Sequence, residues 1–191
     1  MPPKVKIFRE HIIRAAFALT REKGWECINA RSLALQLNCS TQPIFRVYKD
    51  MAELKSDLFS YIEGFYNEYI QSRMKPDNIF FSIGMAYISF AKEEPNLFRM
   101  IFMSNHFKIN SIIEMLDGDE NAIITAGIAA ANNIGLDDAR LLYVETWLFT
   151  HGIASMLVSN SCAFQEKEIE QMLRNAFTGF LKQIKEAQEN D

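Results

Sequence analysis

The chain has few cysteines, prolines and glycines: its 191 residues include three Cys, five Pro and eight Gly. The cysteines Cys27, Cys39 and Cys162 are odd in number, widely spaced and free of any Cys-x-x-Cys pair. This usage argues against a disulfide framework and predicts reduced thiols in a cytoplasmic protein. Internal repeats and low-complexity tracts are also absent, so flexible segments are expected only at the two ends and around residues 159–165.

Sequence signals for catalysis and metal binding are missing as well. There is no nucleophile elbow, Gly-rich phosphate loop or His-Glu-x-x-His pair. No metal-ligand spacing relates the three histidines to one another or to a cysteine: His11, His106 and His151. The acidic stretch 117–120 lacks most ligand positions of a calcium loop, so a break between helices explains it better. Neither catalysis nor a bound metal or cofactor is therefore predicted.

Long hydrophobic runs are absent too. The weakly polar runs 79–91 and 122–131 are too short to span a bilayer, and residues 1–6 lack the apolar core of a signal peptide. Apolar residues make up 49% of the chain, which excludes global disorder, and 191 residues suffice for one or two domains with full cores. We therefore expect a globular protein of the cytoplasm.

The patterns that are present are helical. Strict two-residue alternation is almost absent, and no Asn-Gly or Asp-Gly hairpin signal separates strand-like runs, which favours an all-α fold. Beyond the first fifty residues, helices are expected at 51–73, 77–90, 96–103, 110–117, 120–133, 137–159 and 165–188. A change in charge and pattern near residue 55 divides the chain into two expected domains, 1–55 and 56–191.

Residues 29–54 are the most informative segment, because they predict two short helices, a tight turn and the start of a third helix. Asn29 and Ser40 are expected N-caps, and Asn38 is expected to be a left-handed residue that ends the first helix. Pro43 falls in the first turn of the second helix, where a missing N–H costs little. The segment thus has the local signals of a helix-turn-helix.

The second helix of this segment has an apolar back and a polar front. Its expected buried stripe is Ile44, Val47 and Tyr48. The side chains left facing outward are Thr41, Gln42, Phe45, Arg46 and Lys49. A packed back and a polar front that enters a groove are typical of a DNA-reading helix. Asp50 and Glu53 then form a capping-box-like pair that opens the third helix.

Charge is distributed unevenly along the chain. Residues 1–55 hold ten Lys and Arg against five acidic residues, a net charge of +5, whereas the remainder carries −9. A basic front on an acidic body attracts a polyanion at one end only. Ordinary scatter of charges on solvated helices is the plainer explanation, but the helix-turn-helix pattern falls in the same basic segment.

The segment from about Phe8 to Phe59 resembles the DNA-binding domain of TetR-type (TetR/AcrR) transcriptional repressors. The matching stretches are Ile12–Ala16 and Glu22–Trp25 in the first helix, Leu33–Ala34 in the positioning helix, Ser40–Lys49 in the recognition helix, and Leu54 in the fourth helix. Three residues depart from the family pattern: Phe45 stands for a Tyr, Val47 for a His and Met51 for a Lys. These changes would weaken binding without altering the docking mode, because phosphate contacts position rather than specify.

This resemblance implies a sequence-specific DNA-binding regulator with two sets of contact residues. Those expected at base edges or the nearby backbone are Thr41, Gln42, Pro43 and Arg46. Those expected along phosphates are Arg31, Ser40, Phe45, Lys49 and Lys55. A two-fold dimer would place two recognition helices on one face of the duplex and would select a near-palindromic site.

The body of the chain carries a second resemblance, in Phe90–Phe102 and Trp147–Gly152. These stretches are similar to a TetR C-terminal class named for a Trp, a His and a Gly in its penultimate long helix, which implies a helical domain for ligand sensing and dimerisation. Two apolar stripes are expected to pair with a second subunit in a four-helix bundle. They are Leu142, Glu145, Thr146, Phe149, Ile153 and Met156, and Ile169, Met172, Leu173, Ala176, Phe180 and Ile184. Both stripes could instead face the chain's own core.

Fifteen Phe and nine Met supply side chains for an adaptable apolar pocket, although such residues are more often plain core. Candidate walls for an apolar or aromatic effector are Phe65, Tyr69, Tyr87, Phe102, Met103, His106, Trp147 and His151. His151 could donate a hydrogen bond to a ligand, or it could be a core histidine where helices cross at Gly152.

Two functions are therefore considered. The first is a repressor whose effector changes the spacing of the two recognition helices through its differential affinity for two conformations. The alternative is a non-catalytic helical module that binds a ligand or senses oxidation, with Cys39 as the thiol before the recognition helix. A small turn residue is the plainer explanation of Cys39.

Overall fold

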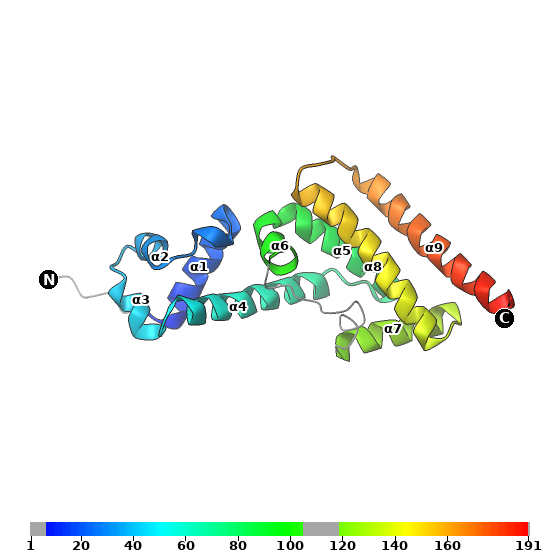
Figure 1. Ribbon diagram of the computed structural model, residues 1–191, viewed down its shortest axis with the longest axis horizontal. Helices are drawn as coiled ribbons and strands as arrows, with labels where there is room; N and C mark the ends of the chain where they lie inside the picture. The colour runs from blue at the N-terminus through cyan, green and yellow to red at the C-terminus, as the bar shows by residue number, and fades with distance from the viewer. Residues whose placement is uncertain (1–6, 105–118, 191) are drawn as a thin grey trace. The chain divides into compact units, whose positions relative to one another are not determined.

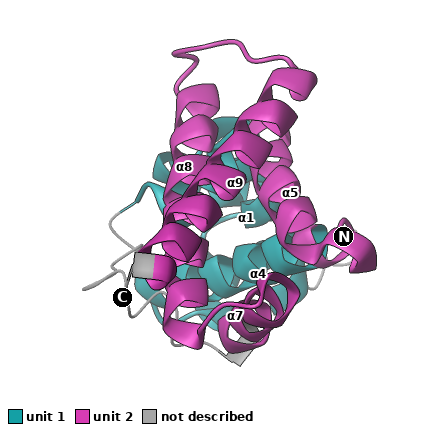
Figure 2. Cartoon of the chain, turned by 90° about the vertical axis from the view of Figure 1, so that its right-hand side faces the viewer, with its two compact units in different colours: residues 1–69, 94–107 teal, residues 70–93, 108–191 magenta. Residues whose placement is uncertain are grey.

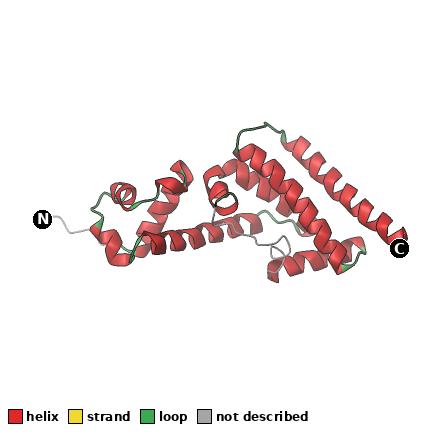
Figure 3. Cartoon of the chain, viewed as in Figure 1, coloured by secondary structure: helices red, strands yellow, loops and turns green. Residues whose placement is uncertain are grey.

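A computed structural model describes residues 7–104 and 119–190, and every regular element in this part of the chain is a helix (Figure 3). The α-helices are α1 (Arg9–Lys23), α2 (Ala30–Gln36), α3 (Gln42–Val47), α4 (Met51–Gln71), α5 (Ile79–Glu93), α6 (Pro95–Phe102), α7 (Asp119–Asn132), α8 (Leu136–Val158) and α9 (Glu166–Asn190) (Figure 1). Short 3-10 helices, η1 (Trp25–Cys27) and η2 (Pro76–Asn78), precede α2 and α5. The predicted all-α fold is confirmed.

Backbone packing divides the chain into two compact units (Figure 2). One unit comprises residues 1–69 and 94–107, and the other comprises 70–93 and 108–191. Helix α6 belongs to the first unit, where it packs on α1 and η1, although α5 and α7 on either side of it in sequence belong to the second. The expected boundary between residues 55 and 56 separates a DNA-binding domain from a ligand-sensing domain. This division by function remains a prediction.

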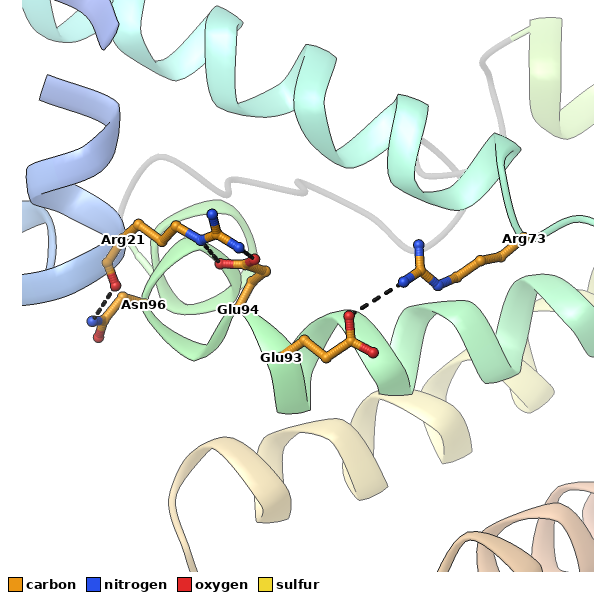
Figure 4. Close-up of polar contacts among 5 residues, drawn as sticks. All are labelled: Arg21, Arg73, Glu93, Glu94 and Asn96. Carbon is orange, nitrogen blue, oxygen red and sulfur yellow. Dashed lines mark hydrogen bonds and ion pairs between the residues drawn. The ribbon is translucent and has the colours of Figure 1, made fainter. Parts of the chain in front are cut away.

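The first unit is held together by the apolar faces of short helices and by an ion pair whose carboxylate is buried. Its fully buried side chains include Ile12, Leu33, Ile44, Tyr48, Leu54, Leu58, Leu97 and Phe98. Helix α1 ends at Gly24, whose φ of 90° disfavours any residue with a Cβ. Both carboxylate oxygens of Glu94, just before α6, accept hydrogen bonds from the Arg21 guanidinium, and Asn96 Nδ2 donates to the Arg21 carbonyl at 3.0 Å (Figure 4). These contacts fix α6 to the end of α1.

The second unit is built from α5, α7, α8 and α9, and α8 packs against each of the other three. One buried core cluster of this unit comprises Ile128, Ala139, Leu142 and Ile184, with aromatic side chains such as Phe80 and Phe177 packed on it. Gly84 of α5 faces α8 and α9, since a Cβ at that position would lie in ordinary van der Waals contact with Leu173, at 3.7 Å, and with Thr150, at 3.9 Å. Arg73 and Glu93 form an ion pair of 3.3 Å within this unit (Figure 4).

Most predicted helix boundaries are confirmed within a few residues. Helix α4 ends at Gln71, two residues earlier than expected, and the helix expected from residue 77 begins at Ile79, because Asp77 lies inside η2. Helix α8 begins at Leu136, one residue before the expected start, and its N-cap is Gly135. The expected helix at 110–117 and the first residues of the acidic stretch 117–120 lie outside the described residues, and α7 begins at Asp119.

Candidate nucleic-acid interface

Helix α2 begins and ends as its sequence predicts. Asn29 Oδ1 accepts two backbone N–H groups of the first turn at 3.0 Å each, and the Ser32 hydroxyl accepts the N–H of Asn29 at 3.1 Å, which makes a reciprocal capping box. At the other end Asn38 has a φ of 49°, and the N–H of Cys39 donates to the Ala34 carbonyl at 2.9 Å. This is a Schellman end, in which the left-handed residue turns the chain out of the helix.

Helix α3 starts one residue later than predicted. Ser40 lies in the turn, and Thr41 takes the N-cap position without a side-chain hydrogen bond, so the prediction for Ser40 is wrong. The reason is that the first turn closes on Thr41, whose carbonyl accepts the N–H of Ile44 at 3.1 Å. Pro43 lies in the first turn as predicted, where its missing N–H leaves no donor unsatisfied. Both Thr41 and Pro43 are half-buried.

The two faces of α3 differ in the predicted way. Ile44 is 0% exposed and Tyr48, which follows the helix, is 1% exposed, while Val47 is half-buried. The outward residues are exposed: Gln42, Phe45, Arg46 and Lys49. The Phe45 ring, with 46% of its surface exposed, is an apolar group on a polar face. The helix therefore presents one amide, one aromatic ring and one cation to solvent, and Lys49, just after it, adds a second cation.

The other predicted DNA contacts lie on neighbouring elements. Arg31, in the first turn of α2, and Ser40, in the turn, are both exposed. Lys55 on α4 is half-buried, and its ammonium lies 5.3 Å from the centre of the Trp25 ring, within the range of a cation–π contact. The roles of these side chains toward DNA remain predictions.

Three side chains far apart in sequence meet at the C-terminal end of α3. Oδ2 of Asp57, on α4, accepts hydrogen bonds from the Tyr48 hydroxyl at 2.5 Å and from Arg9 Nε at 2.8 Å. The guanidinium carbon of Arg9 lies 5.1 Å from the centre of the Tyr48 ring. Burial raises the pKa of Tyr48, and the hydrogen bond from Arg9 lowers the pKa of Asp57, so the phenol stays protonated and the carboxylate charged at neutral pH.

Sequence reasoning missed this cluster of Arg9, Tyr48 and Asp57. The available signal is the hydroxyl of Tyr48 at the end of an apolar stripe, because a buried tyrosine usually needs a hydrogen-bond partner. At the start of α4, the predicted capping-box-like pair makes one of its two hydrogen bonds: the N–H of Glu53 donates to Asp50 Oδ1 at 2.9 Å. The Glu53 carboxylate accepts the N–H of Lys49 at 2.7 Å, one residue before the donor that a capping box would use.

The residues predicted to line a ligand pocket are divided between the two units. The first unit contains Phe65, Tyr69, Phe102 and Met103, and the second contains Tyr87, Trp147 and His151. His106 lies outside the described residues. Within the first unit, the Phe65 ring packs edge-on against Phe17, and the Phe102 ring packs against Tyr66. A hollow of about 260 Å³ in the same unit is lined by Gly24, Trp25, Glu26, Asn96, Arg99, Met100, Met103 and Ser104.

In the second unit, Tyr87 of α5 contacts His151 of α8. The Tyr87 hydroxyl lies 2.8 Å from His151 Nδ1, and the Trp147 indole stacks on the imidazole at 5.0 Å. Burial lowers the pKa of His151, which keeps the ring neutral at pH 7. The expected helix crossing at Gly152 is wrong, because among the described residues nothing lies within 4 Å of a Cβ built there.

The apolar stripe predicted on α8 is divided between core and surface. Three of its members, Leu142, Thr146 and Ile153, are buried within the chain itself. The exposed large apolar side chains of α8 are Leu136, Leu141, Leu148, Phe149 and Met156, and Glu145 is half-buried. The stripe on α9 is likewise divided, with Ile169, Leu173 and Ile184 buried and Met172, Ala176 and Phe180 half-buried.

Helix α8 is also long and apolar enough to cross a membrane by length and composition, with 39% of its most apolar window buried. Core helices of soluble proteins pass the same test, so this observation is weak evidence for a membrane span.

Comparison with known families agrees with this architecture. Residues 80–180, more than half of the chain, match the family model of the tetracyclin repressor-like C-terminal domain. The matched region runs from α5 into α9, and the helix-turn-helix of α2 and α3 lies before it. No curated protein matches the chain. With a helix-turn-helix in front of this C-terminal domain, the chain belongs to the tetracyclin repressor-like (TetR-type) family of transcriptional regulators.

Proposed function

We propose that the protein is a cytoplasmic, sequence-specific repressor of transcription that binds DNA as a homodimer and is released by a small apolar or aromatic effector. The observation that carries the proposal is the two-sided packing of α3, with Ile44 and Tyr48 buried and the polar side left to solvent. A helix held in this way has its outward side chains available to base edges in the major groove. Family membership supports DNA binding and regulation in general.

Within this proposal, the chemistry of each side chain sets its role. Arg46 and Gln42 read base edges, because a guanidinium pairs with guanine and an amide with adenine. Thr41 and Pro43 complete the base-facing set. Phosphate contacts come from Arg31, Ser40, Phe45, Lys49 and Lys55. The net charge of +5 in residues 1–55 adds an attraction that does not depend on sequence.

The proposed dimer uses the exposed apolar face of α8. Leu141, Leu148 and Met156 recur about two turns apart, so they lie on one side of the helix. Such a row of large apolar side chains is typical of a surface that another subunit covers. Pairing α8 and α9 with their copies makes a four-helix bundle, and the two-fold axis predicts a near-palindromic DNA site.

The proposed effector acts only through its different affinities for the DNA-binding and released conformations. Phe and Met side chains among the predicted wall residues suit an apolar or aromatic molecule. In the second unit, the Tyr87–His151 hydrogen bond provides a polar contact beside the Trp147 ring. An effector with one hydrogen-bonding group on an apolar body fits this chemistry.

Selection of bound sequences from a random duplex pool tests the proposal. We expect an enriched near-palindrome, whose affinity is then measured over a range of salt concentrations. Lys49→Ala should lower the salt slope by about one, and Arg46→Ala should relax selectivity at one base position by about tenfold or more. Lys182→Ala removes an exposed cation of α9 and is the matched control. A wild-type protein that enriches no sequence would overturn the proposal, and variants equal to wild type would overturn the assignment of residues.

The thiol-sensing alternative has less support. Cys39 is half-buried, and burial raises the pKa of its thiol, which opposes the thiolate that oxidation requires. This alternative would be favoured if mild oxidation lowered the DNA affinity of the wild type and left the DNA affinity of Cys39→Ser unchanged.

A further inference from the structure

The orientation of α3 depends on contacts at its ends. The helix has only six residues, Thr41 gives it no side-chain cap, and Pro43 gives no N–H to the first turn. A helix this short is not stable alone, because nucleation costs more than so few hydrogen bonds return. The direction of its outward side chains is therefore set by what holds Ile44 and Tyr48.

At the C-terminal end, that support converges on one carboxylate. Tyr48 closes α3 through its N–H, which donates to the Ile44 carbonyl at 3.0 Å, and its hydroxyl donates to Asp57 Oδ2 at 2.5 Å. The same oxygen accepts the Arg9 Nε at 2.8 Å. A single carboxylate oxygen thus joins the first residue of α1, the residue after α3 and the second turn of α4.

The contacts among Arg9, Tyr48 and Asp57, called the tie below, link three helices and also neutralise the charge of the carboxylate. Tyr48 is 1% exposed, whereas the side chains of Asp57 and Arg9 are 27% and 56% exposed. Arg9 balances the charge of Asp57, which lies two residues after the basic segment 1–55, and its guanidinium carbon lies 5.1 Å from the centre of the Tyr48 ring. Removal of the Tyr48 hydroxyl would free the end of α3 while leaving its buried ring in place.

We infer that Arg9, Asp57 and Tyr48 are positioning residues for DNA reading, with the shared carboxylate setting the orientation of α3 and hence the selectivity among base sequences. This inference rests on the proposed function. Base contacts must be held to about 0.5 Å, whereas phosphate contacts mainly supply sequence-independent attraction. Loosening the tie therefore lowers discrimination between sequences more than it lowers binding to DNA in general.

The test compares Tyr48→Phe with the wild type on two duplexes, the site selected by the wild type and an unrelated sequence. We expect affinity for the selected site to fall about tenfold, from the loss of a hydrogen bond to a charged group, with affinity for the unrelated duplex unchanged. Thr20→Val is the matched control, because Thr20 is also fully buried in this unit and its hydroxyl donates to the Ala16 carbonyl at 2.9 Å. This control should lower the melting temperature without changing the ratio of the two affinities.

Two further variants separate the parts of the tie. Asp57→Ala removes the acceptor for both donors, and Asp57→Asn keeps an oxygen for Tyr48 but loses the charge that Arg9 balances. We expect Asp57→Asn to recover part of the selectivity that Asp57→Ala loses. Selection from the random pool, repeated with each folded variant, should give a more degenerate site with Tyr48→Phe and Asp57→Ala than with Thr20→Val.

The outcomes distinguish this inference from the proposed function. A wild type that enriches no site overturns both. A wild type that enriches a site, with Tyr48→Phe showing the same site and the same affinity ratio, overturns the positioning role alone. Equal losses of affinity for the two duplexes would also overturn the positioning role, because they would indicate a general loss of folded protein and not a change in the orientation of α3.

Discussion

Removal of the Arg21 guanidinium should destabilise the first unit, because it leaves a buried carboxylate without its partner. The Glu94 carboxylate is only 5% exposed, and both of its oxygens accept hydrogen bonds from Arg21, which is itself 54% exposed. Breaking a fully buried pair costs about 3–5 kcal/mol, because a charge is left without a partner. Water can reach the Arg21 side of this pair, so we expect Arg21→Ala to lower the free energy of unfolding by about 2 kcal/mol at pH 7.

The cost arises from the charge that remains. In Arg21→Ala, the buried Glu94 carboxylate keeps its desolvation cost but loses the guanidinium that offsets it. The difference in unfolding free energy between the wild type and Arg21→Ala reports this cost. Urea unfolding at fixed protein concentration measures this difference, since a dimer would make stability depend on concentration.

Two controls make the Arg21 result interpretable. Arg140→Ala breaks an ion pair with Asp137, which is 96% exposed, and should cost less than about 0.5 kcal/mol. The double variant Arg21→Met with Glu94→Leu leaves no buried charge and should be more stable than Arg21→Ala. Equal costs for Arg21→Ala and Arg140→Ala, or a double variant no more stable than Arg21→Ala, would refute the reasoning.

Three other predictions test the glycines, the buried histidine and the exposed face of α8. Gly24→Ala should cost about 1–2 kcal/mol because φ is 90° and Glu26 lies 3.1 Å from the new Cβ, whereas Gly64→Ala, in open space on α4, should stabilise by about 0.5–1 kcal/mol; thermal unfolding of both measures this. Burial lowers the pKa of His151 in the folded protein, while the unfolded chain keeps the ordinary pKa of about 6.5. The contribution of the neutral ring to the free energy of unfolding is therefore full above pH 6.5 and is lost as the pH falls from there to the folded pKa. A pH series of urea unfolding should show this loss in the wild type and not in His151→Asn. Leu148→Glu should shift the protein from dimer to monomer in sedimentation, and an unchanged dimer would exclude this face of α8 as the interface.

The features that the sequence predicts correctly are those determined within a few residues. Asn29 caps α2 through the next turn, Asn38 ends it through its own backbone angle, and Pro43 lies in the first turn of α3. Ser40 was a reasonable cap by residue type, but the chain closes its first turn on Thr41. This error of one residue arises because no side-chain cap fixes the start of α3: Thr41 accepts the first N–H through its carbonyl and makes no side-chain cap hydrogen bond.

The contacts that the sequence does not predict join residues far apart along the chain. Arg9 and Asp57 are separated by 48 residues, and Arg21 and Glu94 by 73. Helical periodicity reports which face of an element is apolar, and it contains no information on which charged residue of another element will meet it. The membership of α6 in the first unit was missed for the same reason, since its neighbours in sequence both belong to the second.

The recognition helix α3 depends both on features determined within a few residues and on contacts between distant residues. Its outward residues can be assigned from sequence because a six-residue helix with Ile44 on one side leaves Gln42 and Arg46 on another. The orientation of that outward side depends instead on Tyr48 and Asp57, a contact between elements. Substitutions on the outward side should therefore change which bases are preferred, whereas substitutions at the buried tie should reduce how strongly any base is preferred. In the DNA sites selected by each variant, Arg46→Ala should change the base preference at one position. Tyr48→Phe should instead weaken the base preference at every position.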